Sequence, residues 1–372
     1  TQNLGTDIKM GMARKNQGIA GQVAYNWRNK YYANFNFGYT GSENFALGHQ
    51  YGLFPSGSVA WNIGEENFIR DNWQWINFFK IRYSYGKAGN DNLGNNRFPY
   101  LYSIIEFKDA DNRPIGGYDW AEFGTNRRYG GLGFSQVASP YVTWEMATKQ
   151  DIGLDLSLWK DAFSLIVDVF QDERTGIYMP RNFLPGYVGL TSIPSANVGA
   201  VRSKGIDGSV KIQRDFNKVN VTLRGNITYS KNEIMERDEQ QSVYAYQMQK
   251  GYRVNQTTGL VALGLFKDYD EIRNSPTQTF GAYQPGDIKY KDVNGDGIIN
   301  NDDIVAIGST STPNLIYGMA ASASWKGLDL GFRFQGAGSS SFFIYGKTVY
   351  AFSEGEWGNI LKGMVENRWI SA

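Results

Sequence analysis

Apolar and polar residues alternate along many segments of the chain. In residues 31–39, Tyr31, Phe35 and Tyr39 belong to an apolar set that is interrupted at every second position by residues such as Asn34 and Asn36. Successive side chains of a β-strand point to opposite faces, so this period of two predicts strands with one apolar and one polar face. The same pattern recurs in residues 19–27, 79–85, 152–158, 219–229 and 328–335.

The connections between these segments come in two sizes. Short polar turns lie at residues 28–30, 160–161, 215–217 and 326–327, whereas residues 40–56, 88–143, 175–200 and 232–312 form long Gly- and Asn-rich stretches. Loops of that length are uncommon in compact soluble domains. Outer-membrane barrels, by contrast, have short turns on one side and long loops on the other.

If all short turns share one side, an even number of strands must separate any two of them. The count is met when residues 98–106 and 127–138 are read as two further strands of the sheet. The sequence thus favours a transmembrane barrel over a soluble β-sandwich or propeller, whose strands also alternate.

The distribution of aromatic and charged residues supports the barrel. Trp27, Tyr31, Trp159 and Trp325 stand at the ends of apolar faces, as interfacial girdles do. The opposite faces carry charged residues, which suit a watery lumen better than a sandwich core: Lys80, Arg82, Asp155, Asp168 and Arg224.

Composition narrows the remaining classes. Aromatic residues make up 15% of the chain and 44 Gly stand against 10 Pro, which suits strands and turns. The 37 Lys and Arg balance 36 Asp and Glu, so we expect no nucleic-acid partner. No apolar run is long enough for a membrane helix. Cysteine is absent, which excludes thiolate sites. His49 is the single histidine, which cannot by itself build a His-rich metal site or an ordinary Ser-His-Asp triad, and we read it as a surface or packing residue.

Residues 292–303, DVNGDGIINNDD, have the spacing of an EF-hand-type calcium loop. Such a loop needs oxygen donors at positions 1, 3, 5 and 12, a Gly at 6 and a backbone carbonyl at 7, with position 9 often acting through water. Asp rather than Glu stands at position 12, which shortens the reach of the closing carboxylate, and Asp302 is a substitute there. The predicted donors to a structural Ca²⁺ are Asp292, Asn294, Asp296, the Ile298 carbonyl, Asn300 and Asp303.

The alternative for this segment is an Asx- and Gly-rich turn that needs no metal. Two other acidic groups, Asp109, Asp111 and Asp119, and Asp268, Asp270 and Glu271, are read as solvated loop charge. A glycosidase needs a carboxylate pair at a defined separation. Nothing in the sequence demands such a pair, so we predict that the protein is not an enzyme.

Aromatic residues in the connections are candidates for substrate binding. Their rings could stack on a sugar or hold a peptide, or they could pack the loops against one another. These candidates are Trp73, Trp75, Tyr118, Trp120, Tyr187, Tyr244 and Tyr246.

Four stretches in order resemble the C-terminal barrel region of SusC/RagA-type TonB-dependent outer-membrane transporters of Bacteroidetes. They are YGLFPSGSVAWNIGEENF, INFFKIRYSYGKAGN, VTWEMATKQDIGLDLSLWKDAFSLIVDVFQDERTG and PGDIKYKDVNGDGIINNDDIVAIGSTSTPNLIYG followed by WKGLDLGFRFQGAG. The resemblance covers nearly the whole chain. One departure is Ser139-Pro140, where the family usually has Asn-Pro.

The resemblance implies an all-β fold, an antiparallel transmembrane β-barrel with long extracellular loops and short periplasmic turns. Residues 1–372 are then part of a barrel of about 22 strands, of which this chain supplies about 12 or 13, without the plug domain or the final strands. Residues 232–312 become a long extracellular loop region that carries the calcium loop at 292–303.

The implied function is TonB-dependent uptake of an oligosaccharide or peptide through the outer membrane. The implied partners are a SusD-like surface lipoprotein, outer-membrane lipid, and TonB, which acts through the absent N-terminal region. A different class stays open, a secreted calcium-stabilised β-protein that binds carbohydrate or surfaces. The two differ in whether the intact protein needs detergent for extraction.

Overall fold

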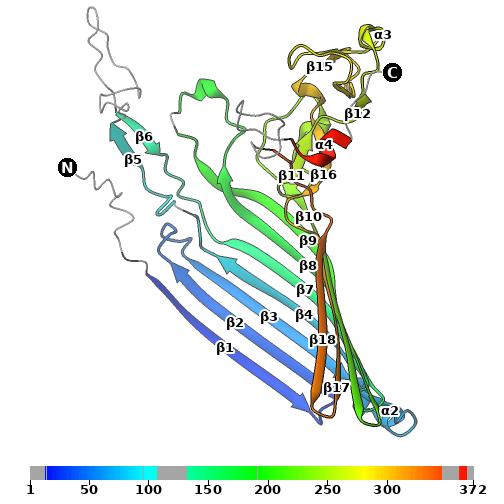
Figure 1. The fold of residues 1–372 in the computed structure, drawn as a ribbon. Helices are drawn as coiled ribbons and strands as arrows, with labels where there is room; N and C mark the ends of the chain where they lie inside the picture. Colours follow the sequence, from blue (N-terminus) through cyan, green and yellow to red (C-terminus); the bar gives the residue numbers. More distant parts are fainter. Residues whose placement is uncertain are drawn as a thin grey trace, which may run out of the picture. The chain divides into compact units, whose positions relative to one another are not determined.

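The computed structural model describes residues 13, 15–94, 96–106, 132–190, 192–345 and 360–366. Ten strands form one sheet in the order β1-β2-β3-β4-β7-β8-β9-β10-β17-β18 (Figure 1). Neighbours from β1 through β10 pair antiparallel. The sheet strands are β1 (Asn16–Trp27), β2 (Tyr31–Ser42), β3 (Tyr51–Asn62), β4 (Ile76–Asn90), β7 (Glu145–Leu158), β8 (Phe163–Pro180), β9 (Ser195–Phe216), β10 (Val219–Glu236), β17 (Leu315–Trp325) and β18 (Leu328–Gly338).

Smaller elements occupy the connections. Four two-stranded sheets pair β5 with β6, β11 with β16, β12 with β14 and β13 with β15. Their bounds are β5 (Ser103–Glu106), β6 (Leu132–Gln136), β11 (Gln256–Gly259), β12 (Ala262–Leu265), β13 (Thr277–Gln278), β14 (Ile288–Tyr290), β15 (Ile298–Ile299) and β16 (Val305–Thr310). The helices are η1 (Ile63–Glu65), α2 (Asn67–Arg70), η2 (Gly186–Val188), η3 (Ala245–Gln247), α3 (Tyr269–Arg273), η4 (Asn301–Asp303) and α4 (Lys362–Glu366). Among the described residues, no helix is both long and apolar enough to cross a membrane.

The chain divides into two compact units. One comprises residues 1–240 and 317–336 and holds most of the large sheet, and the other comprises residues 241–316 and 337–372. The second unit contains the three small sheets that follow β10 in the sequence.

The predicted alternation is confirmed, and the apolar face of the sheet is uncovered. Ile19, Val23 and Tyr83 are 70%, 67% and 41% exposed. On the opposite face, Arg82 forms ion pairs with Asp155 and Asp168, so these three charged residues share the polar face as expected. Large exposed apolar surfaces mark contact with a partner or a membrane.

Two predicted strands do not belong to the large sheet. Residues 98–106 contribute only β5 and residues 127–138 only β6, which pair with each other within the connection between β4 and β7; residues 127–131 lie outside the described part of the chain. The number of sheet strands between any two short turns is still even, because both strands leave the large sheet together. The number of strands in the large sheet is therefore ten rather than about 12 or 13 among the described residues.

The predicted long loop at residues 40–56 is also wrong. β2 runs to Ser42 and β3 begins at Tyr51, so the connection is short. Gly and Pro obscure the alternation here, since Pro55 lies within β3 opposite Phe37. The other three long connections are present, at residues 91–144, 181–194 and 237–314.

A small hydrophobic core lies at the end of the sheet opposite the short turns. Phe45, Leu93, Val142 and Trp144 are buried there, with Phe54 packed against them. The indole of Trp144 donates to the Gln50 carbonyl at 2.9 Å. Phe54 follows the exposed Leu53 in β3. Because neighbouring strand residues point to opposite faces, this core lies on the polar side of the sheet and fixes the bases of the connections there.

Stacked aromatic rings line the short-turn end of the apolar face, as the sequence predicts. The ring centroids of Trp27 and Tyr31 are 5.7 Å apart, and those of Tyr31 and Trp61 are 6.3 Å apart. Glu66, between η1 and α2, accepts hydrogen bonds from the Tyr31 hydroxyl at 2.8 Å and from the Trp61 indole at 3.2 Å. It also accepts one from Lys30 Nζ at 2.9 Å. One carboxylate thus holds the aromatic row in place.

Acid is expected to weaken this contact. The hydrogen bond from Lys30, followed by those from Tyr31 and Trp61, lowers the pKa of Glu66 below its ordinary value of 4.5. A carboxylate whose pKa is lower in the folded state stabilises the fold at pH values above its pKa in the unfolded state. This stabilisation is lost as the pH falls through its pKa in the folded state. The unfolding midpoint of the full-length protein is measured between about pH 3 and 6. As the pH falls, the midpoint of Glu66→Gln should decrease less than that of the wild type. The exposed neighbour Glu65→Gln is the control, and equal acid loss in both variants contradicts the role of Glu66.

Candidate functional site

The predicted calcium loop, residues 292–303, lies in the second unit between β14 and β16. Asp292 Oδ1 and Oδ2 accept the backbone N–H groups of Gly295 at 2.6 Å and Gly297 at 2.9 Å. Both glycines have positive φ, +79° and +80°, a conformation that L residues with side chains rarely adopt. The local sequence therefore folds as a tight, Asp-anchored turn.

The second half of the loop closes on Asp303. This side chain is 0% exposed, and its two oxygens accept Val293 N–H at 2.7 Å and Asn300 N–H at 2.9 Å. The Asn300 side chain accepts Asp302 N–H at 2.5 Å, which completes a capping box on η4. The Asp303 carboxylate therefore joins the two ends of the loop through backbone N–H groups.

The remaining predicted donors are oxygen atoms that accept local backbone N–H groups in this structure. Asp296 Oδ1 accepts Ile298 N–H at 2.7 Å, and Asn294 Oδ1 accepts Asp296 N–H at 3.0 Å. No three His, Cys, Asp or Glu side chains in the described part of the chain are grouped closely enough to hold an ion. A bound ion therefore needs the amide oxygens of Asn294 and Asn300 and the Ile298 carbonyl as well as the carboxylates.

The structure brings two predicted substrate residues to this loop. Tyr244 and Tyr246 stack with ring centroids 5.4 Å apart and an interplanar angle of 15°. The Tyr246 hydroxyl donates to the Asp302 carbonyl at 2.7 Å, and Asn294 Nδ2 donates to the Tyr244 hydroxyl at 3.1 Å. Burial raises the pKa of Tyr246, and Tyr244 and the nearby acidic side chains add to the effect. In this structure the pair supports the loop.

The other aromatic candidates are spread widely. Trp73 and Trp75 stack 6.4 Å apart, and Trp75 stacks on Trp159 at 5.8 Å, all at the end of the sheet with the short turns. Tyr187 lies in η2 at the opposite end and is 91% exposed. Tyr118 and Trp120 lie outside the described residues. Trp73 and Trp75 therefore do not share a surface with Tyr187.

The acidic group in α3 stabilises the local fold. Asp268 caps this helix by accepting Glu271 N–H at 2.8 Å. Glu271 accepts the Lys267 backbone N–H at 2.9 Å and pairs with Lys289 at 3.0 Å. The backbone hydrogen bond, followed by the bond from Lys289, lowers the pKa of Glu271. Asp109, Asp111 and Asp119 lie outside the described residues.

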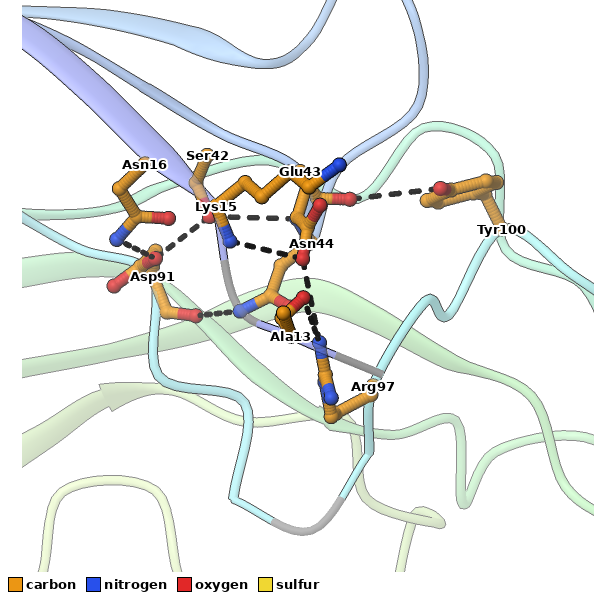
Figure 2. A network of polar contacts seen from close by, with 9 residues as sticks. All are labelled: Ala13, Lys15, Asn16, Ser42, Glu43, Asn44, Asp91, Arg97 and Tyr100. Carbon is orange, nitrogen blue, oxygen red and sulfur yellow. Dashed lines mark hydrogen bonds and ion pairs between the residues drawn. The ribbon is translucent and has the colours of Figure 1, made fainter. Parts of the chain in front are cut away.

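A polar network that the sequence did not indicate joins three segments at the base of the β4–β7 connection (Figure 2). Glu43 Oε1 accepts the Lys15 backbone N–H at 3.0 Å and Arg97 Nη2 at 3.3 Å. Arg97, only 5% exposed, also donates to the Ala13 carbonyl at 3.3 Å. Asp91 accepts the Ser42 hydroxyl at 2.6 Å. Burial, followed by the charge of Glu43, raises the pKa of Tyr100, which donates to the Glu43 carbonyl at 3.5 Å.

A second polar cluster lies on the polar face of the sheet. Arg82 contacts Asp168 at 2.8 Å, Asp155 at 3.1 Å and Asp151 at 3.9 Å. Strand register places Gly153 between Arg82 and Asp168. A Cβ at Gly153 would meet the ends of both charged side chains, so a larger residue there requires the guanidinium and the Asp168 carboxylate to move.

Comparisons with known proteins agree with this architecture. No protein-family model matches the chain. It is 28% identical over 365 residues to "TonB-dependent receptor P26" of Formosa agariphila, covering 94% of this chain and 34% of that protein. It is 26% identical over 339 residues to "TonB-dependent receptor P3" of the same organism, covering 88% of this chain and 32% of that protein. "TonB-dependent receptor SusC" of Bacteroides thetaiotaomicron is 25% identical over 218 residues, covering 58% of this chain and 20% of that protein.

Solved structures with the same fold include "Structure of the RagAB peptide transporter". The TM-score is 0.65 at 19% sequence identity, and the match covers 86% of this chain and 32% of that one. The chain spans about a third of the length of the first curated relatives it matches. The resemblance to SusC/RagA-type TonB-dependent transporters, the antiparallel all-β fold class and the outer-membrane location are confirmed. All named relatives are receptors or transporters rather than enzymes.

Proposed function

We propose that the chain is part of the membrane-spanning barrel of a TonB-dependent importer that takes up a peptide or oligosaccharide. The observation that carries the proposal is the ten-stranded sheet with its uncovered apolar face. The fold of the chain is similar to that of a peptide transporter, with a TM-score of 0.65. A secreted β-protein does not account for that face, because exposed apolar surface of this extent aggregates in water.

The proposed mechanism assigns capture to the end of the sheet that carries the long connections. The connections at 91–144, 181–194 and 237–314 are each candidates for this role, which a SusD-like lipoprotein shares. TonB acts through a region outside this chain and supplies the energy for passage. The polar network around Glu43 and Arg97 gives the first of these connections a fixed base.

Uptake by cells tests this function. We expect a strain without the full-length gene to lose growth on one class of nutrient, peptides or oligosaccharides, when that class is the limiting source. Deleting TonB should cause the same loss, and a surface lipoprotein should purify with the tagged transporter in detergent. Recovery of the intact protein in a detergent-free soluble fraction contradicts the proposal, as does unchanged growth on both nutrient classes.

We further propose that Ca²⁺ binds residues 292–303 and stabilises the second unit. The ligands are Asp292, Asn294, Asp296, the Ile298 carbonyl, Asn300 and Asp303, and hard oxygen donors are those that Ca²⁺ prefers. The support is the donor chemistry, together with the two positive-φ glycines and the burial of Asp303. The ion supplies charge compensation for the carboxylates and performs no catalysis in this proposal.

Calcium removal should expose the 237–314 connection to protease. We expect a chelator to speed cleavage of this connection in the full-length protein, and added Ca²⁺ at about 1 mM to restore protection, since extracellular modules bind at about 10⁻⁴ to 10⁻³ M. The variant carrying Asp292→Ala and Asp296→Ala should lose the calcium response. The control is Asp270→Ala, an exposed carboxylate in α3. No metal in the parent by elemental analysis, with cleavage unchanged by chelator, excludes the ion.

A further inference from the structure

The uncovered apolar face contains a groove close to the short turns. Strand register aligns Tyr25, Ala33, Val59 and Tyr83 in one row across β1 to β4. Ala33 is small between larger neighbours, and the resulting groove has a volume of about 580 Å³. A second groove of about 440 Å³ shares these four residues and extends to Phe35 and Gly57. Both grooves are open along the surface of the sheet rather than enclosed.

The groove is not required by the packing of the strands. A Cβ built on Gly57 has only one near neighbour, the Asn34 carbonyl oxygen at 3.6 Å, which is ordinary van der Waals contact. A Cβ atom therefore fits at this position without displacing its neighbours. The small residues leave the space open on a face where neighbouring positions carry large apolar side chains.

The end of the groove nearest the short turns combines an aromatic row with a cation. Trp27, Tyr31 and Trp61 form the row. Beyond it, the Arg28 guanidinium lies 5.0 Å from the centre of the Trp27 ring. Lys30 is paired with Glu66, whereas none of the ion pairs among the described residues includes Arg28. An aromatic row with a cation beside it is typical of the membrane interface, where lipid phosphates lie.

We propose that this groove binds one acyl chain of a membrane phospholipid, with the phosphate of the same lipid contacting Arg28. The apolar lining fits the chain, and the exposed guanidinium complements the phosphate in charge. The groove is continuous with the lipid-facing surface that an outer-membrane location requires. The proposal rests on that location and is independent of the nutrient transported.

Native mass spectrometry of the full-length transporter in mild detergent tests the proposal. The probes are phosphatidylethanolamine and phosphatidylglycerol with palmitoyl chains, added to delipidated protein. The variants are Ala33→Phe and Gly57→Leu, which fill the groove, and Arg28→Gln, which removes the cation. The matched control is Ala323→Phe on β17, which lies two residues from Trp325 as Ala33 lies two residues from Tyr31.

We expect the wild type and Ala323→Phe to retain one phospholipid. Ala33→Phe and Gly57→Leu should bind both probes at least about tenfold more weakly, and Arg28→Gln about tenfold more weakly through loss of the charge-assisted contact. Heat-modifiable migration on a gel confirms that each variant is folded. Equal lipid retention in Ala33→Phe, Gly57→Leu and Ala323→Phe overturns the proposal. If the groove variants change from a dimer of this protein to a monomer and retain their lipid, the groove is the contact between two protein copies. That result overturns the proposal as well.

Discussion

Replacing Arg82 with Met should destabilise the large sheet by about 2 kcal/mol or more. The side chain is 33% exposed and compensates three carboxylates on the polar face, those of Asp151, Asp155 and Asp168. Removal of one partner from a buried ion pair costs about 3–5 kcal/mol, and partial exposure reduces this figure. Denaturant unfolding of the full-length protein in detergent measures the effect.

The partners of Arg82 supply the control for that experiment. If the loss arises from uncompensated charge, adding Asp155→Asn and Asp168→Asn to Arg82→Met should recover part of the stability. Arg224→Met removes an arginine that forms none of the ion pairs between described residues, and it should have a small effect. If Arg82→Met and Arg224→Met lower the free energy of unfolding by the same amount, the ion pairs of Arg82 do not stabilise the sheet.

Replacing Asp303 with Ala should open the second unit locally, even in buffer that contains chelator. The carboxylate is fully buried and accepts Val293 N–H and Asn300 N–H. Each buried donor left without an acceptor costs about 1–3 kcal/mol, so the expected loss for these two donors is about 2–6 kcal/mol. Hydrogen exchange of the 237–314 connection measures it.

A graded series separates this structural role from metal binding. Asp303→Asn keeps one acceptor oxygen and should have an intermediate effect. Asp302→Ala leaves the capping hydrogen bonds of Asp303 intact and is the matched control. Exchange rates that are the same in Asp303→Ala and Asp302→Ala contradict the role of the buried carboxylate.

Strands were the most predictable part of this fold. Residues such as Tyr31, Phe35 and Val23 repeat every second position, and the pattern depends only on local geometry. The alternation cannot distinguish a strand of the large sheet from a strand that pairs within a connection. β5 and β6 show this limit, because their register with each other involves residues far apart in sequence.

Side-chain partners over long distances were not predictable. Glu43 and Arg97 are 54 positions apart and neither lies in a recognisable motif, so nothing in the sequence indicates that they meet. The spacing of residues 292–303 did identify a compact turn, because its hydrogen bonds are local. The same spacing gave no sign that Tyr244 and Tyr246, about 50 positions earlier, would bond to it.

The neighbouring positions of β10 and β17 in the sheet have a consequence for the order of folding. β9 and β10 are joined by a tight turn, whereas β10 and β17 are separated by residues 237–314. Closing a loop of that length instead of a two-residue turn costs about 3 kcal/mol of chain entropy. We therefore expect the β9–β10 and β17–β18 hairpins, each joined by a tight turn, to form before β10 pairs with β17. Prior folding of the second unit shortens the effective loop and speeds that final step.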